Sequence, residues 1–170
     1  MNHYRRYFVK DENSEQVLNK NDILNILEKQ NYDAIVQGPG SNEKPHYNSC
    51  SSVYEEYCHI IDDMDKALEL IKYIYPNLYP IIEKEIKHNN QMCLCNMIIA
   101  KREVFMDYCQ FLFTIYDKLQ NIIDYKNRDS YQRRCFGFLS ERLFRPFLIA
   151  KGYKFIGKNV GDPAHNDQIQ

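Results

Sequence analysis

The sequence lacks a surplus of charge of either sign. Its 22 Lys and Arg residues are balanced by 23 Asp and Glu residues, which leaves a formal net charge of -1 over 170 residues. Proteins that bind nucleic acids usually attract the phosphates with a positive field, and this balance does not provide one. We therefore expect no nucleic acid among the partners of this protein.

Long hydrophobic runs are also missing. The longest segment without a formal charge covers residues 88–100, whereas a helix that crosses a membrane needs about 20 apolar residues. The first residues contain no apolar core of a signal peptide, because Lys10, Asp11 and Glu12 follow almost at once. These absences predict a cytoplasmic protein without a transmembrane segment or an export signal.

The cysteines do not form an obvious disulfide or zinc pattern. With 44% hydrophobic residues, the chain has enough apolar material to form a core without covalent links. Structural zinc ligands lie about two to four residues apart on a turn, but Cys93-Leu94-Cys95 lies in an apolar run. We expect reduced thiols, most of them buried, at all six positions: Cys50, Cys58, Cys93, Cys95, Cys109 and Cys135.

The spacing of apolar residues predicts alternating helices and strands in one domain. The predicted helices cover residues 23–30, 64–74, 78–86, 105–122 and 139–147, and the predicted strands cover residues 34–36, 92–100 and 153–156. Gly38-Pro39-Gly40 ends the first of these strands and begins a loop that extends to about Tyr47. This order of elements indicates an α/β domain with a partly parallel sheet.

Three separated segments resemble the signature blocks of a bacterial domain family of unknown function, which occurs in capsular-polysaccharide and lipopolysaccharide glycosyltransferases. The segments are His3-Tyr4-Arg5-Arg6-Tyr7-Phe8, Asn96-Met97-Ile98-Ile99 and Gln132-x-Arg134-x-x-Gly137-Phe138-Leu139-Ser140-Glu141-Arg142-Leu143. Tyr54-x-x-Tyr57-x-His59-x-x-x-Asp63 and Tyr75-Pro76 are similar to further family features. The resemblance covers roughly residues 3–150, and the order of the blocks agrees with that of the family.

The resemblance implies an incomplete GT-A-like domain, of the kind that transfers sugars from nucleotide diphosphates, with a mixed, mostly parallel sheet and flanking helices. The implied reaction moves a sugar, a hexose such as galactofuranose, onto a capsular, exopolysaccharide or lipopolysaccharide glycan. Residues 1–157 would form the C-terminal portion of this domain, and residues 158–170 a disordered polar tail. The implied location is the cytoplasm or the inner face of the membrane.

One departure from the family concerns the front of the domain. In the family, the His-Tyr-Arg-Arg block follows the donor-binding part, whereas here it begins at His3. We expect the donor-binding part to come from a second chain, or the protein to self-associate. The alternative is the remnant of a truncated gene, or a non-catalytic partner that docks through its Arg side chains and its 14 Tyr residues.

The His-Tyr-Arg-Arg block is the candidate site for the donor diphosphate. Arg5 and Arg6 provide forked donors that suit phosphate oxygens, and His3 adds a third group. Surface ion pairs are the alternative for these residues, and the resemblance favours diphosphate binding. Charge neutralisation by the block would make a metal cofactor unnecessary.

A divalent metal site is an alternative that the sequence leaves open. Asp63-Met64-Asp65 matches the D-x-D pattern by which many glycosyltransferases hold Mn²⁺ or Mg²⁺. In a metal site this pattern should end a buried strand, but here it begins a predicted helix. Helix capping is therefore the favoured role of these carboxylates.

Glu141 is the candidate catalytic residue. An inverting transferase needs a general base that takes the proton from the acceptor hydroxyl, and Glu141 follows a glycine at the predicted start of a helix. The alternative is an ion pair with Arg145, four residues further along the helix. The resemblance favours catalysis.

The remaining candidates would contact the donor or the acceptor. Asn96 lies alone in an apolar run and must form hydrogen bonds if it is buried, either to an acceptor sugar or between two strands. His59 either belongs to an acceptor site or is an ordinary surface residue. The full set of predicted substrate-binding residues is His59, Asp63, Asn96, Gln132 and Arg134.

Overall fold

A computed structural model describes residues 6–10, 16–37, 52, 54–55, 57, 59–89, 91, 93 and 96–161. Several predictions fall outside these residues and concern His3, Arg5, Gly38-Pro39-Gly40 and the following loop, Cys50, Cys58, Cys95 and residues 162–170. Of the described cysteines, Cys93 and Cys135 are buried and Cys109 is half-buried, and none of these three is in a disulfide. The expectation of reduced thiols is confirmed for these three.

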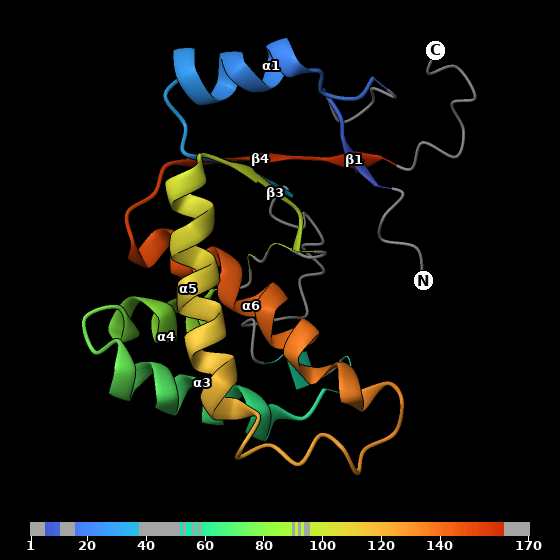
Figure 1. The fold of residues 1–170 in the computed structure, drawn as a ribbon, viewed down its shortest axis with the longest axis vertical. Helices are drawn as coiled ribbons and strands as arrows, with labels where there is room; N and C mark the ends of the chain where they lie inside the picture. The colour runs from blue at the N-terminus through green and yellow to red at the C-terminus, as the bar shows by residue number, and fades with distance from the viewer. Residues whose placement is uncertain are drawn as a thin grey trace.

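The described chain alternates strands and helices (Figure 1). In chain order the elements are β1 (Tyr7–Phe8), α1 (Lys20–Leu24), the π-helix η2 (Asn25–Lys29), β2 (Ala34–Gln37), α3 (Ile61–Ile74), α4 (Tyr79–His88), β3 (Ile98–Ala100), α5 (Arg102–Leu119), the 3₁₀ helix η4 (Gln132–Arg134), α6 (Cys135–Ala150), β4 (Phe155–Lys158) and β5 (Val160–Gly161). Among the described residues, no helix is long and apolar enough to cross a membrane.

A small sheet with strand order β3-β2-β4 separates two apolar layers. Successive side chains of a strand point to opposite faces. Ala34 and Val36 of β2 therefore join the large core beneath the helices, whereas Ile35 joins a smaller core with Ile26 and Phe8. Figure 1 shows α1 on one side of the sheet and α3 to α6 on the other.

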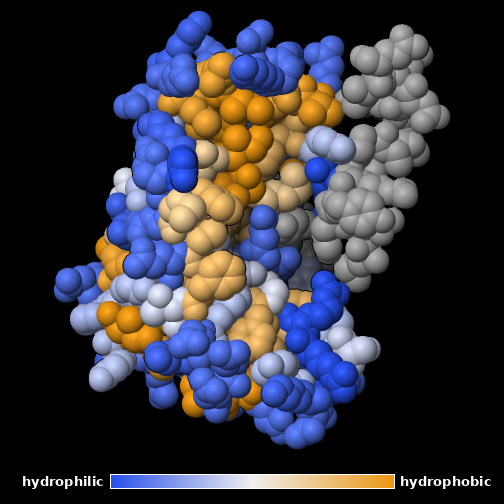
Figure 2. Space-filling view, in the orientation of Figure 1, coloured by the Kyte–Doolittle hydropathy of each residue, from blue (hydrophilic) through white to orange (hydrophobic). Residues whose placement is uncertain are grey.

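The large core is built by the packing of α6 against α3, α4 and α5. Leu139, Leu143 and Phe147 of α6 are almost completely buried in it. The outer side of α5 stays apolar, because Phe105, Met106 and Phe113 are 46%, 55% and 63% exposed. Figure 2 shows apolar side chains on this face along α5 and below α1.

Most of the predicted elements are confirmed, with shifts at their ends. Asn19 is the N-cap of α1: its side chain accepts a hydrogen bond from the Asp22 N–H at 3.0 Å, and the Asp22 carboxylate accepts one from the Asn19 N–H at 3.0 Å. This capping box explains why the helix begins there. The next helix, α3, ends at Ile74, before Pro76, as expected from the missing N–H of proline.

The expectation of a mostly parallel sheet is wrong for the described residues. Only the pairing of β2 with β4 is parallel there, while β2 with β3 and β1 with β5 are antiparallel. The sheet is mixed, as expected. Whether two strands pair parallel or antiparallel depends on the path that the chain takes between them. The apolar pattern within one strand contains no information about that path.

The apolar run of residues 92–100 is not one strand. Only Ile98–Ala100 form β3, and Asn96 has a left-handed backbone with a φ of 50°. Asparagine tolerates this conformation better than most residues, and a strand cannot pass through it. Met92, Leu94 and Cys95 of the run lie outside the described residues.

Regular structure continues into the predicted tail. The last predicted strand is found two residues later, as β4, and Lys158 belongs to it. Val160 pairs with Phe8 in the antiparallel β1–β5 ladder. A Cβ on Gly161 would lie 3.0 Å from Cγ1 of Val9, so this glycine allows the two segments to approach closely. The first residues after position 157 are thus part of the fold.

Candidate functional site

A cluster of aromatic side chains surrounds His59, just before α3. The ring centroids of His59 and Phe138 are 3.9 Å apart, those of His59 and Tyr54 are 4.6 Å apart, and His59 stacks on Tyr131 at 5.8 Å. Tyr131 donates a hydrogen bond to the Tyr57 carbonyl at 3.2 Å. Tyr57 and Tyr131 are 52% and 40% exposed, whereas Tyr54 and Phe138 are buried. We call these five residues the aromatic cluster.

His59 is neutral within this cluster. Burial, and to a lesser extent the nearby positive charge of Arg142, lower its pKa to about 4, while Asp63 acts in the opposite direction. Its side chain is 9% exposed. His59 is therefore an aromatic packing residue at neutral pH, with a polar edge, and not an ordinary surface histidine.

The neutral state of His59 predicts an acid-dependent loss of stability. The unfolded chain binds a proton at a pKa of 6.5 and the folded chain only near 4, so protons favour unfolding as the pH falls through this range. We expect His59 to remove about 1–2 kcal/mol of stability between pH 7 and pH 5. Urea unfolding of the unaltered chain and of His59→Phe at both pH values measures this difference.

The His59→Phe variant should lose less stability over that pH range than the unaltered chain. His88→Gln is the matched control, because His88 lies exposed at the end of α4. If the free energy of unfolding changes equally with pH in the unaltered chain and in His59→Phe, His59 is not the group that causes the acid-dependent loss of stability.

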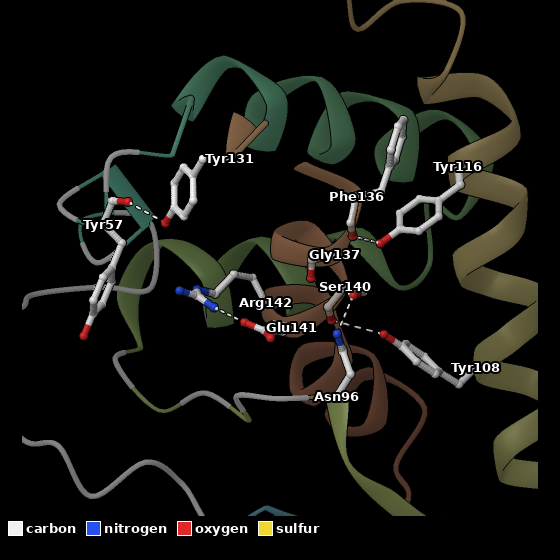
Figure 3. Close-up of polar contacts among 10 residues, drawn as sticks. All are labelled: Tyr57, Asn96, Tyr108, Tyr116, Tyr131, Phe136, Gly137, Ser140, Glu141 and Arg142. Carbon is white, nitrogen blue, oxygen red and sulfur yellow. Dashed lines mark hydrogen bonds and ion pairs between the residues drawn. The ribbon is translucent and has the colours of Figure 1, made fainter. Parts of the chain in front are cut away.

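Glu141 and Arg142 lie beside the aromatic cluster in the second turn of α6. Nη1 of Arg142 donates to Oε2 of Glu141 at 3.3 Å. Glu141 is 23% exposed at its side chain and Arg142 only 3%. Figure 3 shows the guanidinium of Arg142 extending from α6 toward the side where Tyr57 and Tyr131 lie.

Two sequence-based expectations about Glu141 differ from its surroundings in the structure. The helix begins at Cys135, so Gly137 lies inside it, and Glu141 does not directly follow a turn. The alternative pair with Arg145 is not formed, because Arg145 donates to Glu85 at 2.8 Å and to Gln91 at 2.6 Å. The carboxylate of Glu141 instead lies between solvent and the buried Arg142.

Hydrogen bonds to Ser140 hold this part of α6 in place. Asn96 donates from Nδ2 to the Ser140 hydroxyl at 2.7 Å, and that hydroxyl donates to the Gly137 carbonyl at 2.8 Å. Tyr108 donates to the Ser140 carbonyl at 3.1 Å, and Tyr116 donates to the Phe136 carbonyl. Asn96 thus connects the segment before β3 to Ser140 of α6, the residue before Glu141 (Figure 3). It does not connect two strands.

Asp63 forms a buried ion pair. Its side chain is fully buried, and its two carboxylate oxygens accept hydrogen bonds from Arg128 at 2.5 and 2.8 Å. It lies in the first turn of α3, whose N-cap residue is Ile60, so the expected capping role is not seen. Asp63 anchors the segment before η4, and its fully buried carboxylate is not in contact with solvent.

The D-x-D pattern therefore does not converge on one point. Asp65 is exposed, while Asp63 is buried against Arg128. No group of three or more His, Cys, Asp or Glu side chains is arranged to hold a metal ion among the residues that the structure describes.

The remaining predicted residues divide between two ends of the molecule. Gln132 and Arg134 lie in η4, and the guanidinium of Arg134 is 5.3 Å from the ring centroid of Phe138. Arg6 is exposed just before β1, at the end of the molecule away from the start of α6 (Figure 1). The structure thus gathers His59, Arg134 and Glu141 around the aromatic cluster, and it leaves Arg6 outside.

Sequence reasoning missed Arg142 as a residue of this site. Its position three residues after Leu139 places it on the apolar face of α6, where a charged residue is rare unless it is paired. That spacing predicts a buried charge that needs partners, and it was available in the sequence.

Comparison with known proteins gives a family match and a structural match for this chain. The family model described as "Domain of unknown function (DUF4422)" matches residues 1–152. The apo structure of the bifunctional glycosyltransferase WbbM has a similar fold, with a TM-score of 0.77 and 23% sequence identity. The match covers 92% of this chain and 32% of that one, so this chain spans about a third of the length of WbbM. No curated protein matches the chain.

These findings identify the architecture as an α/β glycosyltransferase-like fold. The family match extends over nearly the whole described chain, from the residues before β1 to the end of α6. The chain therefore belongs to the family described as the Domain of unknown function (DUF4422).

Proposed function

We propose that this chain takes part in glycosyl transfer, moving a sugar from a nucleotide diphosphate to a surface glycan. The observation that carries the proposal is the similarity of fold to a bifunctional glycosyltransferase over 92% of the chain. The polar and aromatic residues at the start of α6 are consistent with it, because sugar sites combine aromatic faces with a few placed polar groups.

The aromatic cluster is the proposed acceptor-binding surface. Tyr57 and Tyr131 are exposed, and their rings are suited to stacking on the C–H face of a sugar. Arg134 lies beside Phe138 at the edge of the cluster and can donate to sugar hydroxyls. Gln132 and Asn96, on η4 and before β3, are the other proposed polar contacts.

Glu141 is the proposed general base. Its partly exposed carboxylate takes the proton of the acceptor hydroxyl as the hydroxyl oxygen attacks the anomeric carbon. The bond from that carbon to the diphosphate oxygen breaks, and the nucleoside diphosphate leaves. The contact of His3, Arg5 and Arg6 with this leaving group, the reaction without a metal, and a capsular or lipopolysaccharide acceptor remain predictions.

A transfer assay tests the proposal directly. The chain is incubated, alone and together with the donor-binding part of a family member, with nucleotide-activated hexoses and an oligosaccharide acceptor. Acceptor-dependent release of the nucleoside diphosphate is measured with and without chelator. We expect release that requires the acceptor and survives the chelator. A chain that binds neither donor nor acceptor would contradict transfer and favour a non-catalytic interaction module.

A further inference from the structure

Arg142 is a buried cation with an incomplete set of partners. A guanidinium carries five N–H donors. The hydrogen bond to Glu141 at 3.3 Å is long, and Nε of Arg142 has no partner within the described residues. Arg128 and Arg145, in contrast, each form two short hydrogen bonds. The Arg142 side chain is the least exposed of the three, at 3%, compared with 15% for Arg128 and 13% for Arg145.

Two further unsatisfied polar atoms lie near this guanidinium. The Tyr54 hydroxyl and Nδ1 of His59 are buried and lack a partner in the part of the chain that the structure describes. The Arg142 guanidinium carbon is 5.8 Å from the Tyr54 ring centroid, and the Tyr54 ring is 4.6 Å from that of His59. Buried polar atoms are nearly always bonded in native proteins, so three in one place require an explanation.

Among the described residues, nearby groups do not supply the missing hydrogen bonds. Asp63 also lies within electrostatic reach of Tyr54 and His59, but both of its oxygens are bonded to Arg128. Glu141 provides one distant oxygen and is partly in solvent. The cluster therefore has unused donors, although its charges balance, with Arg142 and Arg128 against Glu141 and Asp63.

We propose that Arg142, Tyr54 and His59 bind an oxyanion group of a ligand. A forked guanidinium binds phosphate and carboxylate oxygens in pairs, and a phenol O–H and an imidazole N–H add donors of the same kind. The Glu141 carboxylate lies between the Arg142 guanidinium and solvent. The oxyanion therefore reaches Arg142 by replacing this carboxylate. That exchange releases Glu141 toward the acceptor.

The inference depends on the proposed glycosyl transfer only for the identity of the ligand. The oxyanion is either the diphosphate of a sugar nucleotide or the carboxylate of an acidic acceptor sugar. Inorganic pyrophosphate and glucuronate represent the two sources, and neither probe requires transfer activity.

Calorimetric titration of the chain with each probe tests the proposal. At least one probe should bind, and Arg142→Met should weaken that binding about tenfold or more, as expected for a lost charged hydrogen-bond pair. Arg142→Lys keeps the charge but loses the fork, and it should also weaken binding. Arg133→Met is the control, because Arg133 is exposed in the neighbouring turn and donates to the Arg128 carbonyl.

Thermal melting separates a binding role from a structural one. Because Arg142 is buried without full compensation, Arg142→Met should keep or raise the Tm, whereas Arg145→Met should lower it by leaving Glu85 without its charged partner. Failure of both probes to bind, equal weakening in Arg133→Met, or an Arg142→Met variant that melts as early as Arg145→Met or does not fold would overturn the proposal. Binding without any transfer activity would refute the proposed function and leave this inference standing.

Discussion

Replacing Glu141 by Gln is expected to lower kcat by about 10²- to 10⁴-fold, the usual contribution of a general base. Glutamine keeps the shape of the side chain and can still accept a hydrogen bond from Arg142, but it cannot take a proton at neutral pH. Donor affinity should change little, because the lost interaction belongs to the chemical step. Single-turnover rates and a donor titration of the same variant measure the two effects.

The stability of this variant provides an internal check. The contact of Glu141 with Arg142 is long and partly exposed, so we expect Glu141→Gln to change the free energy of unfolding by less than about 1 kcal/mol. Glu103→Gln, an exposed residue in the first turn of α5, is the matched control and should keep full activity. Normal turnover in Glu141→Gln would eliminate this residue as the base.

The largest loss of stability is expected from Arg128→Met. This change leaves the fully buried carboxylate of Asp63 without a counter-charge, and uncompensated buried charges cost about 3–5 kcal/mol. Asp63 also raises the pKa of Arg128, chiefly through their hydrogen bonds, as expected for a tightly coupled pair. Equilibrium urea unfolding at pH 7 measures the difference in the free energy of unfolding.

Two further variants test whether the loss of stability in Arg128→Met comes from the unpaired buried charge of Asp63. In the double variant Asp63→Leu with Arg128→Met, no charge remains buried, and we expect much of the lost stability to return. Lys66→Met breaks the exposed ion pair with Asp62 and should cost no more than about 0.5 kcal/mol. A loss in Arg128→Met that is no larger than in Lys66→Met would contradict the assignment of a buried structural pair.

The two largest expected effects concern different quantities at one end of the molecule: kcat for Glu141→Gln and the free energy of unfolding for Arg128→Met. Asp63 and Glu141 are both carboxylates of the predicted site, but one is fully buried against two guanidinium nitrogens and the other is partly in solvent. A D-x-D pattern therefore contains a structural residue here, and the partly exposed Glu141 is the carboxylate that we propose for proton transfer.

The sequence by itself determined where most of the helices lie, and it determined some of their ends. Asn19 and Asp22 form a capping box within one turn, and Pro76 lies just beyond the end of α3. These signals depend on neighbours within about four residues, so they can be recognised without the fold. Successive residues of β2 also alternate between two cores, with Ala34 and Val36 in one and Ile35 in the other. This alternation likewise depends only on neighbouring residues.

Only the tertiary structure decided strand direction and the partners of buried charges. Asp63 and Arg128 are 65 residues apart in the chain, and Asn96 is 44 residues from Ser140. Arg142 meets Tyr54 and His59 only because α6 packs near the start of α3. A charge in low-dielectric surroundings requires a partner, but its own neighbours in the sequence do not specify which one, because distant segments are brought together only by the packing of the core.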